Sequence, residues 1–293
     1  MLKTLVYGLY PRSEKLRRSY NRWERGMIKT EDLSEIIREE KYAFYEMMER
    51  SGIEIYTDPL FNWYDILRPI VLSMENVKLG PLTRYLETNT FYRMPEFYGI
   101  PRIFKDLTKF EQLEENPPLP AYQLDGKSLL FLPSPYSLVR MSRLEADLRE
   151  DVLLRSLVDE YIKIVKAFSG RKLVLFDVFD YGKHNISYLD PLLQSTGVIL
   201  IARGIPKEQN LKGLKHKFEA LVADGVDRDL LNYSDSLGIK AVSAHKTKIE
   251  GASIEKKMDD SVDLITHDDY MDFLPREIAD IKVEVLGKMG DTA

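Results

Sequence analysis

Charged side chains follow several of the apolar segments that read as β-strands, and these side chains are the first candidates for chemistry. In barrels of alternating strands and helices, binding and catalytic groups lie in the loops after the strands. Each residue alone is a weak signal, because polar residues are common in loops and at helix caps. The candidates are Arg12 after the first segment, Asp58 after the second, Asp177 and Asp180 after the fifth, Arg203 after the sixth and His245 after the eighth.

The segment 12–25 concentrates positive charge directly after the first apolar segment. Its six basic residues outweigh two acidic ones, Glu14 and Glu24, which leaves a net charge of +4. Such a cluster can bind an anionic ligand through charge-assisted hydrogen bonds. A solvated helix face would show the same composition.

The residue counts exclude several classes of site and of protein. The chain has no cysteine, which rules out disulfides, thiolate metal sites and cysteine nucleophiles. Its four histidines are never within six residues of one another, so there is no local metal-ligand pair, and no nucleotide-binding or serine-hydrolase motif occurs. With 42 basic and 47 acidic residues the net charge is −5, which argues against a nucleic-acid binder. No run approaches the roughly 20 apolar residues of a membrane span, and no signal peptide is evident, so we expect a cytoplasmic protein that contacts neither nucleic acid nor membrane.

Strand and helix patterns alternate along the chain. Helices are predicted at residues 16–27, between Thr30 as N-cap and Gly52 just past the end, and at 62–75, 144–168 and 275–289. Strands are predicted at residues 4–10, 53–56, 87–94, 128–132, 172–176, 198–202, 220–223 and 239–242. This alternation implies parallel strands, and we expect one (β/α)8 barrel domain of the TIM type over residues 1–293. A doubly wound open sheet would give a similar pattern.

Three ordered segments resemble the N-terminal half of cobalamin-independent methionine synthase. Residues 8–12 (GLYPR) and the following KLRRSYNRW are similar to the turn and basic helix that open that family. Residues 51–65 (SGIEIYTDPLFNWYD) match a second segment, with Asp58, Tyr64 and Asp65 in register. Residues 82–97 (LTRYLETNTFYRMPEF) match a third through Thr88-Asn89 and Pro95-Glu96-Phe97.

The resemblance implies a fold and a role. In the family, the C-terminal barrel carries zinc and homocysteine, and the N-terminal barrel helps to bind the polyglutamate tail of methyltetrahydrofolate. The tail-binding Arg-Glu-Leu-Lys corresponds to Glu14-Lys15-Leu16-Arg17, with the first two charges exchanged, and a family lysine corresponds to Arg84. The resemblance therefore implies a tail site of Lys15, Arg17, Arg84 and Arg12, with Asp58 and His245 as further pocket residues. Two of the family's zinc ligands are cysteines, so this chain is expected to bind no metal or cofactor and to leave zinc to a partner.

Three functions remain open. The first is the folate-binding subunit of a two-chain methionine synthase, inactive alone and working with a separately encoded zinc-bearing barrel. The second is a stand-alone enzyme of the wider superfamily that includes uroporphyrinogen decarboxylase, with Asp58, Asp177, Asp180 or His245 as general acid or base. The third is a scaffold for the catalytic barrel.

Overall fold

The computed structural model describes residues 3–86, 91–105, 107, 125–204, 206–223, 244–247 and 264–291. The chain forms two compact units. Unit 1 comprises residues 1–63, 109–129 and 244–293, and unit 2 comprises residues 64–108 and 130–243. Among the described residues, no helix is both long and apolar enough to cross a bilayer.

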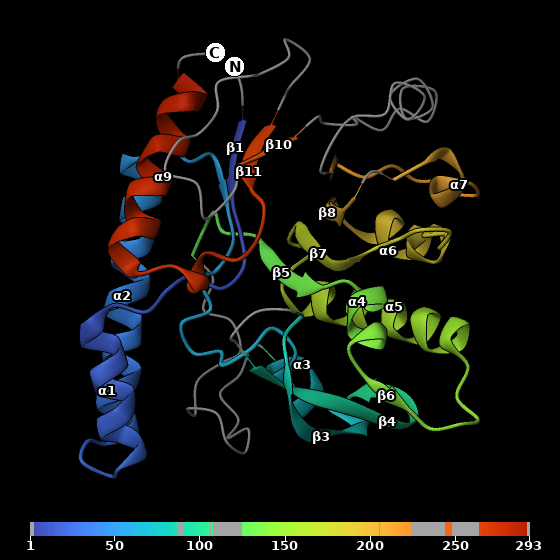
Figure 1. The fold of residues 1–293 in the computed structure, drawn as a ribbon, viewed down its shortest axis with the longest axis horizontal. Helices are drawn as coiled ribbons and strands as arrows, with labels where there is room; N and C mark the ends of the chain where they lie inside the picture. The colour runs from blue at the N-terminus through green and yellow to red at the C-terminus, as the bar shows by residue number, and fades with distance from the viewer. Residues whose placement is uncertain are drawn as a thin grey trace. The chain divides into compact units, whose positions relative to one another are not determined.

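Unit 1 is built on a four-stranded parallel sheet in the order β10-β11-β1-β2. Helices pack beside the strands, with α9 against β1 and β11 and α1 against α2 (Figure 1). The strands are β1 (Lys3–Val6), β2 (Ile55–Tyr56), β10 (Ala244–Thr247) and β11 (Leu264–His267), and the helices are α1 (Glu14–Glu24), α2 (Thr30–Arg50), the 3-10 turn η2 (Met271–Phe273) and α9 (Arg276–Asp291).

Unit 2 contains a second four-stranded parallel sheet, in the order β5-β7-β8-β9. Its strands are β5 (Leu130–Pro133), β7 (Leu173–Asp180), β8 (Val198–Arg203) and β9 (Ala220–Val222). They are almost wholly buried, as continuous apolar runs in a covered parallel sheet should be. The helices of this unit are α3 (Arg68–Leu72), α4 (Pro135–Arg140), α5 (Glu150–Ala167), the 3-10 turn η1 (Ser187–Leu189), α6 (Asp190–Ser195) and α7 (Glu208–Leu211).

A smaller sheet of unit 2 contradicts the predicted third barrel strand. Residues 91–94 belong to β4 (Phe91–Ile103), which pairs antiparallel with β3 (Met74–Arg84) and parallel with the short β6 (Arg143–Leu144). Both long strands keep many exposed positions, as antiparallel strands with one solvated face do. Residues 87–90, which include Thr88 and Asn89 of the third family-like segment, lie outside the described residues.

Several other predicted elements need correction. The helix predicted at 62–75 shrinks to α3, because Asp65 accepts hydrogen bonds from the Leu67 and Arg68 amides and Met74 already begins β3. The predicted first strand ends at Val6, and Gly8 then takes a left-handed φ of 76°. The N-cap of α2 is Lys29, one residue before the predicted Thr30. Gly52 has a φ of 73°, the left-handed conformation expected just past a helix end.

The α/β class with parallel sheets is confirmed. The eighth strand was predicted at 239–242, outside the described residues, whereas β10 and the unpredicted β11 are present. Helix α4 was also missed, because its six residues are too few to show a helical period. In the β5-β7-β8-β9 sheet the strand order follows the order along the chain, and in the unit 1 sheet the last strand, β11, pairs with the first, β1. Both arrangements occur in a (β/α) barrel, whose last strand closes on the first. A closed barrel is not shown, and the single domain stays a prediction.

Candidate functional site

The loops after β1 and β2 are joined to each other at the carboxyl end of the unit 1 sheet. The Gly8 amide donates to Oγ1 of Thr57 at 2.9 Å, and the Tyr10 amide donates to the Pro59 carbonyl at 3.1 Å. The left-handed φ of Gly8 turns the chain into this arrangement, which disfavours a side chain at this position. The loops that carry the predicted site residues Arg12 and Asp58 therefore lie side by side.

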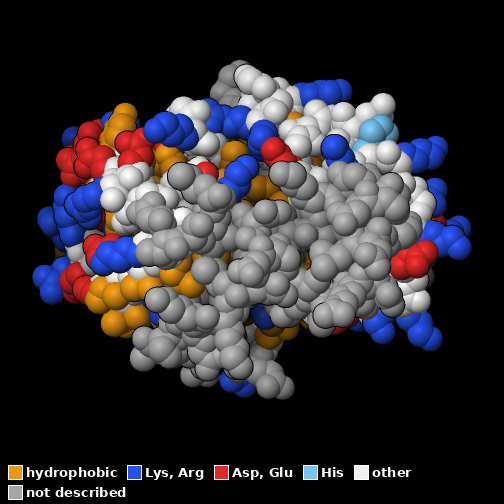
Figure 2. Space-filling model, turned by 90° about the horizontal axis from the view of Figure 1, so that it is seen from above, with side chains coloured by type: hydrophobic (Ala, Val, Ile, Leu, Met, Phe, Trp, Pro, Cys, Tyr) orange, Lys and Arg blue, Asp and Glu red, His pale blue; other side chains and the backbone are white. Residues whose placement is uncertain are grey.

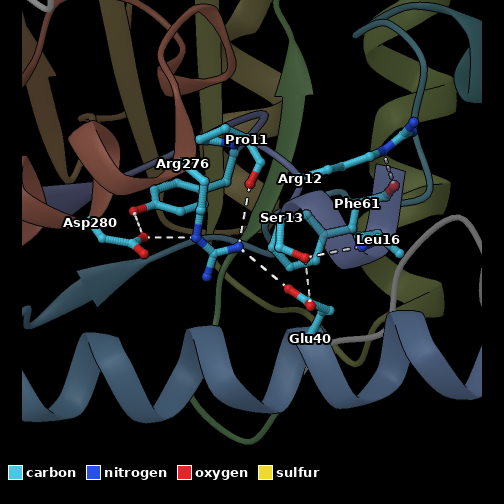
Figure 3. Close-up of polar contacts among 9 residues, drawn as sticks. Pro11, Arg12, Ser13, Leu16, Glu40, Phe61, Arg276 and Asp280 are labelled. Carbon is cyan, nitrogen blue, oxygen red and sulfur yellow. Dashed lines mark hydrogen bonds and ion pairs between the residues drawn. The ribbon is translucent and has the colours of Figure 1, made fainter. Parts of the chain in front are cut away.

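Arg12 holds the second of these loops in place. Its Nε donates to the Phe61 carbonyl at 2.8 Å, the contact drawn in Figure 3, and its Nη2 donates to the Trp63 carbonyl at 2.7 Å. The guanidinium also lies 3.9 Å from the centroid of the Tyr20 ring, and the Tyr20 hydroxyl reaches the same Phe61 carbonyl. Arg12 thus ties the start of α1 to the loop after β2.

A network around Arg276 anchors the start of α1 (Figure 3). The Arg276 guanidinium donates to Asp280 at 2.8 Å and to the Pro11 carbonyl at 3.3 Å, and its Nη1 lies 3.5 Å from Glu40. Glu40 accepts a hydrogen bond from the Ser13 hydroxyl, which itself caps α1 by accepting from the Leu16 amide. Elements from three parts of the sequence therefore fix the helix that carries the predicted tail-binding residues.

Asp58 lies beneath these loops rather than on their surface. Its carboxylate is fully buried and receives the ammonium group of Lys41, from α2, at 2.8 Å. Its other oxygen accepts from the Leu60 amide at 2.7 Å, and Leu60 adopts a left-handed φ of 55°. Burial lowers the pKa of Lys41, and the charge of Asp58 opposes that shift. Asp58 therefore holds the loop after β2 in place from inside unit 1.

Lys15 and Arg17 lie on the solvent-exposed side of α1. The Lys15 side chain is 60% exposed and pairs with Glu39 of α2 at 2.8 Å. The Arg17 side chain is 58% exposed and lies 3.2 Å from Glu14, which also pairs with Arg18. On the face of the molecule drawn in Figure 2, basic and acidic side chains likewise intermingle on the left. The basic segment is thus a mixed-charge surface rather than a purely positive one.

The last residue of β11, His267, is a residue at this end of the sheet that the sequence did not single out. His267 accepts from the Tyr7 amide through Nε2 at 3.1 Å, so the proton lies on Nδ1, which donates to the Asp269 carbonyl at 2.5 Å. The ring also stacks on Tyr7 with centroids 4.2 Å apart. Both ring nitrogens are therefore engaged within the fold.

Asp272, in η2, has the most perturbed carboxyl group at this end of the sheet. The residue is exposed, yet protein atoms crowd its carboxyl group and raise its pKa to about 7. The charge of Asp269 adds to this rise and that of Arg12 opposes it. A carboxyl group that titrates near neutrality is suited to general acid–base chemistry.

Unit 2 holds Arg84 and the aspartates after β7. Arg84 is an exposed residue at the end of β3, paired in register with Phe91. Asp177 is fully buried and accepts hydrogen bonds from the hydroxyls of Ser134 and Ser137, at the start of α4. Asp180 accepts from the Gly182 amide at 2.6 Å and is paired in register with Arg203 of β8.

His245, the remaining predicted site residue, lies on a strand of the unit 1 sheet. His245 belongs to β10, but its side chain lies outside the described part of the structure. Among the described residues, no three histidine, aspartate or glutamate side chains form a group that could hold a metal ion. Because the chain has no cysteine, it does not fit the two-cysteine zinc site of the methionine synthase family.

Among the comparisons with known proteins, the one with solved structures finds similar chains. No protein-family model matches the chain, and no curated protein matches it in sequence. The structure resembles a B12-independent methionine synthase from Shewanella sp. W3-18-1, solved in complex with selenomethionine, with a TM-score of 0.65 and 13% identity over 91% of this chain and 90% of that one. It also resembles the putative vitamin-B12-independent methionine synthase from Listeria monocytogenes, with a TM-score of 0.55 and 13% identity over 97% and 95% of the two chains. The chain therefore has the fold of B12-independent methionine synthases, and the resemblance found in its sequence is confirmed at that level.

Proposed function

We propose that this chain is the folate-binding subunit of a two-chain cobalamin-independent methionine synthase. The observation that supports the proposal is a methionine-synthase fold over more than 90% of a chain that contains no cysteine. Methyl transfer from a tertiary amine requires a strong sulfur nucleophile. A chain without the family's metal ligands is suited to hold the methyl donor, while a separate zinc-bearing barrel activates homocysteine in the same cytoplasmic enzyme. We further propose that the eight parallel strands belong to one closed barrel domain.

The exposed face of α1 supports a binding role for Lys15 and Arg17. Their ion pairs with Glu39 and Glu14 are solvent-exposed on both sides, and such pairs contribute only about 0–1 kcal/mol. A γ-glutamyl carboxylate can replace these partners at little cost. The helix itself is held by Arg12, Ser13 and the Arg276 network, so the cations are presented on a fixed support. Arg84 would provide a further contact to the tail.

A binding experiment tests this assignment. Isothermal titration with methyltetrahydropteroyl triglutamate should show weaker binding for Lys15→Ala, Arg17→Ala and Arg84→Ala. For exposed charge-assisted contacts we expect a loss of about 1–1.5 kcal/mol each, which is roughly 5- to 12-fold in Kd. The monoglutamate should bind the wild type and the variants alike. Arg22→Ala is the matched control, since Arg22 is an exposed arginine on the same helix. Equal effects of Arg22→Ala and Arg17→Ala would show nonspecific electrostatics instead of a tail site.

An activity experiment tests the two-chain arrangement. The tagged chain is purified from its native host, and the co-purifying cysteine-bearing barrel is identified and produced separately. We expect no methionine from this chain alone and more from the equimolar mixture than from the partner, because a held donor reacts as if intramolecular. If the partner is fully active alone, the proposed contribution of this chain to methionine formation is refuted. A stable complex with unchanged activity would identify a scaffold.

Asp272 favours a second candidate, a stand-alone barrel enzyme. Its pKa of about 7 and its place after β11 suit a general acid or base, whereas Asp58 and Asp177 are committed to buried partners. This candidate predicts turnover by the isolated chain that Asp272→Asn abolishes. No turnover of uroporphyrinogen-like or methyl-transfer substrates by the wild-type chain would exclude it for those reactions.

A further inference from the structure

Four rings gather at the carboxyl ends of β5 and β7 in unit 2, outside the proposed tail site. Tyr136 comes from α4, after β5, while Tyr181, His184 and Tyr188 come from the segment after β7. His184 stacks on Tyr136 with centroids 4.2 Å apart and an interplanar angle of 19°. Tyr181 lies 5.7 Å from Tyr136, and Tyr188 lies 5.5 Å from His184. Because β5 and β7 are adjacent in the sheet, these rings meet where α/β folds place their ligands.

Two polar atoms of this ring cluster are buried without a hydrogen-bond partner. They are the hydroxyl of Tyr181 and the Nε2 atom of His184. Tyr181 is only 3% exposed, so its hydroxyl is not satisfied by bulk water. Leaving such a group unsatisfied is unfavourable, and native proteins pair the large majority of their buried polar atoms.

The segment that carries the rings is held rigidly. The buried amide of Asn210 donates to the carbonyls of Gly182 and His184 at 3.1 and 2.6 Å, and the Ile186 amide donates to the Asn210 carbonyl at 2.8 Å. Asn185 reaches two further carbonyls, those of Gln209 and Lys212. The two unsatisfied atoms are therefore fixed in place, as a preorganised binding site requires.

The charges around the rings indicate what kind of ligand fits. The carboxylates of Glu150, Asp177 and Asp180 place negative charge near the rings and raise the pKa of their titratable groups. The guanidinium of Arg140 has the opposite effect. Burial raises the pKa of Tyr188 and lowers that of His184, so both side chains are neutral near pH 7. An anion would be repelled by the carboxylates, whereas a flat neutral ring can stack and exchange hydrogen bonds with the Tyr181 hydroxyl and the His184 imidazole.

We propose that Tyr136, Tyr181, His184 and Tyr188 form a binding site for a planar, uncharged nitrogen heterocycle. The ring of the ligand stacks on the cluster, and its ring nitrogens and amide groups satisfy the Tyr181 hydroxyl and Nε2 of His184. This site shares no residue with the proposed tail site and does not depend on the proposed role in methyl transfer.

Imidazole NMR tests the proposal directly. The chain has only four histidines, so selective ¹⁵N labelling gives few ring signals, and a His184→Asn variant assigns those of His184. Pterin and adenine are titrated separately, to distinguish two sources of the same ring chemistry, and glutamate is the anionic control. We expect saturable movement of the His184 signals with at least one heterocycle and none with glutamate.

Two tyrosine variants separate binding from folding. Tyr181→Phe removes an unpartnered hydroxyl but keeps the ring, so the fold should be retained and the affinity should fall roughly 2- to 12-fold. Tyr98→Phe, on the exposed side of β4, is the matched control and should leave the affinity unchanged. If neither heterocycle moves the His184 signals, or if Tyr181→Phe binds as the wild type does, the cluster is only a packing element and the proposal is wrong.

Discussion

Breaking the buried Lys41–Asp58 pair should destabilise unit 1 strongly. The Lys41 and Asp58 side chains are 3% and 0% exposed, and their charged atoms are 2.8 Å apart. Lys41→Met leaves a buried carboxylate without its counter-ion, a change that costs about 3–5 kcal/mol. That is a large share of the roughly 5–15 kcal/mol that stabilises a typical domain.

The two single variants should differ and should not be additive. Asp58→Asn leaves Lys41 without the charge that raises its pKa, so the amine can lose its proton and limit the cost. It also keeps an oxygen for the Leu60 amide. The double variant Lys41→Met/Asp58→Asn has no buried charge left, and its loss should be well below the sum of the two single losses.

Tryptophan fluorescence during urea unfolding is the appropriate assay. The chain has two tryptophans, Trp23 and Trp63, and both belong to unit 1 with the ion pair. Glu39→Gln is the matched control, because the Lys15–Glu39 pair has the same 2.8 Å separation but side chains 60% and 57% exposed, so its loss should cost less than about 1 kcal/mol. A loss below about 1 kcal/mol for Lys41→Met, or additivity of the two single variants, would refute a structural role for Asp58 as one half of a buried pair.

Three further predictions concern packing, pH and metal. Gly287→Ala should destabilise unit 1 by about 1–3 kcal/mol or more in urea unfolding, because its Cβ would lie 1.6 Å from the Ser51 carbonyl, whereas Gly126→Ala has open space and should be neutral. Asp272 has a folded pKa raised to about 7, so the folded state binds its proton more tightly than the unfolded state, and stability should fall as pH rises from about 4 to 7. Asp272→Asn should flatten that part of the stability curve, and an unchanged slope would contradict the raised pKa. Elemental analysis after gel filtration should find no stoichiometric zinc, since the chain has no cysteine, and about one zinc per chain would refute this.

Local sequence patterns predicted a structural feature correctly where the physical cause of that feature lies in the neighbouring residues. The apolar runs at 172–176 and 198–202 became buried parallel strands, because such runs need cover on both faces. Gly52 and Gly170 follow helices with left-handed φ, a conformation that glycine adopts without a steric penalty. A thiolate metal site is excluded by composition alone, because the chain has no cysteine to supply the ligand.

The roles of the charged candidates depended on distant partners. The sequence marked Asp58 as a possible pocket residue, but the structure pairs it with Lys41, seventeen positions earlier in the chain. Arg12 was predicted to contact an anion, yet it donates to carbonyls about fifty positions away. A charge before a helix or after a strand looks the same in sequence whether it faces solvent or a buried counter-ion.

The amino-acid sequence by itself determined the α/β class, the main helices of both units and the exclusion of cysteine chemistry. Only the tertiary structure decided that the strands at 74–84 and 91–103 pair antiparallel and that the rings of Tyr136 and His184 stack. Strand direction and ring stacking depend on which segments meet in space, and neither leaves a periodic trace along the chain. Periodicity records which side of a segment is buried, whereas the identity of the neighbour is set by the packing of the whole unit.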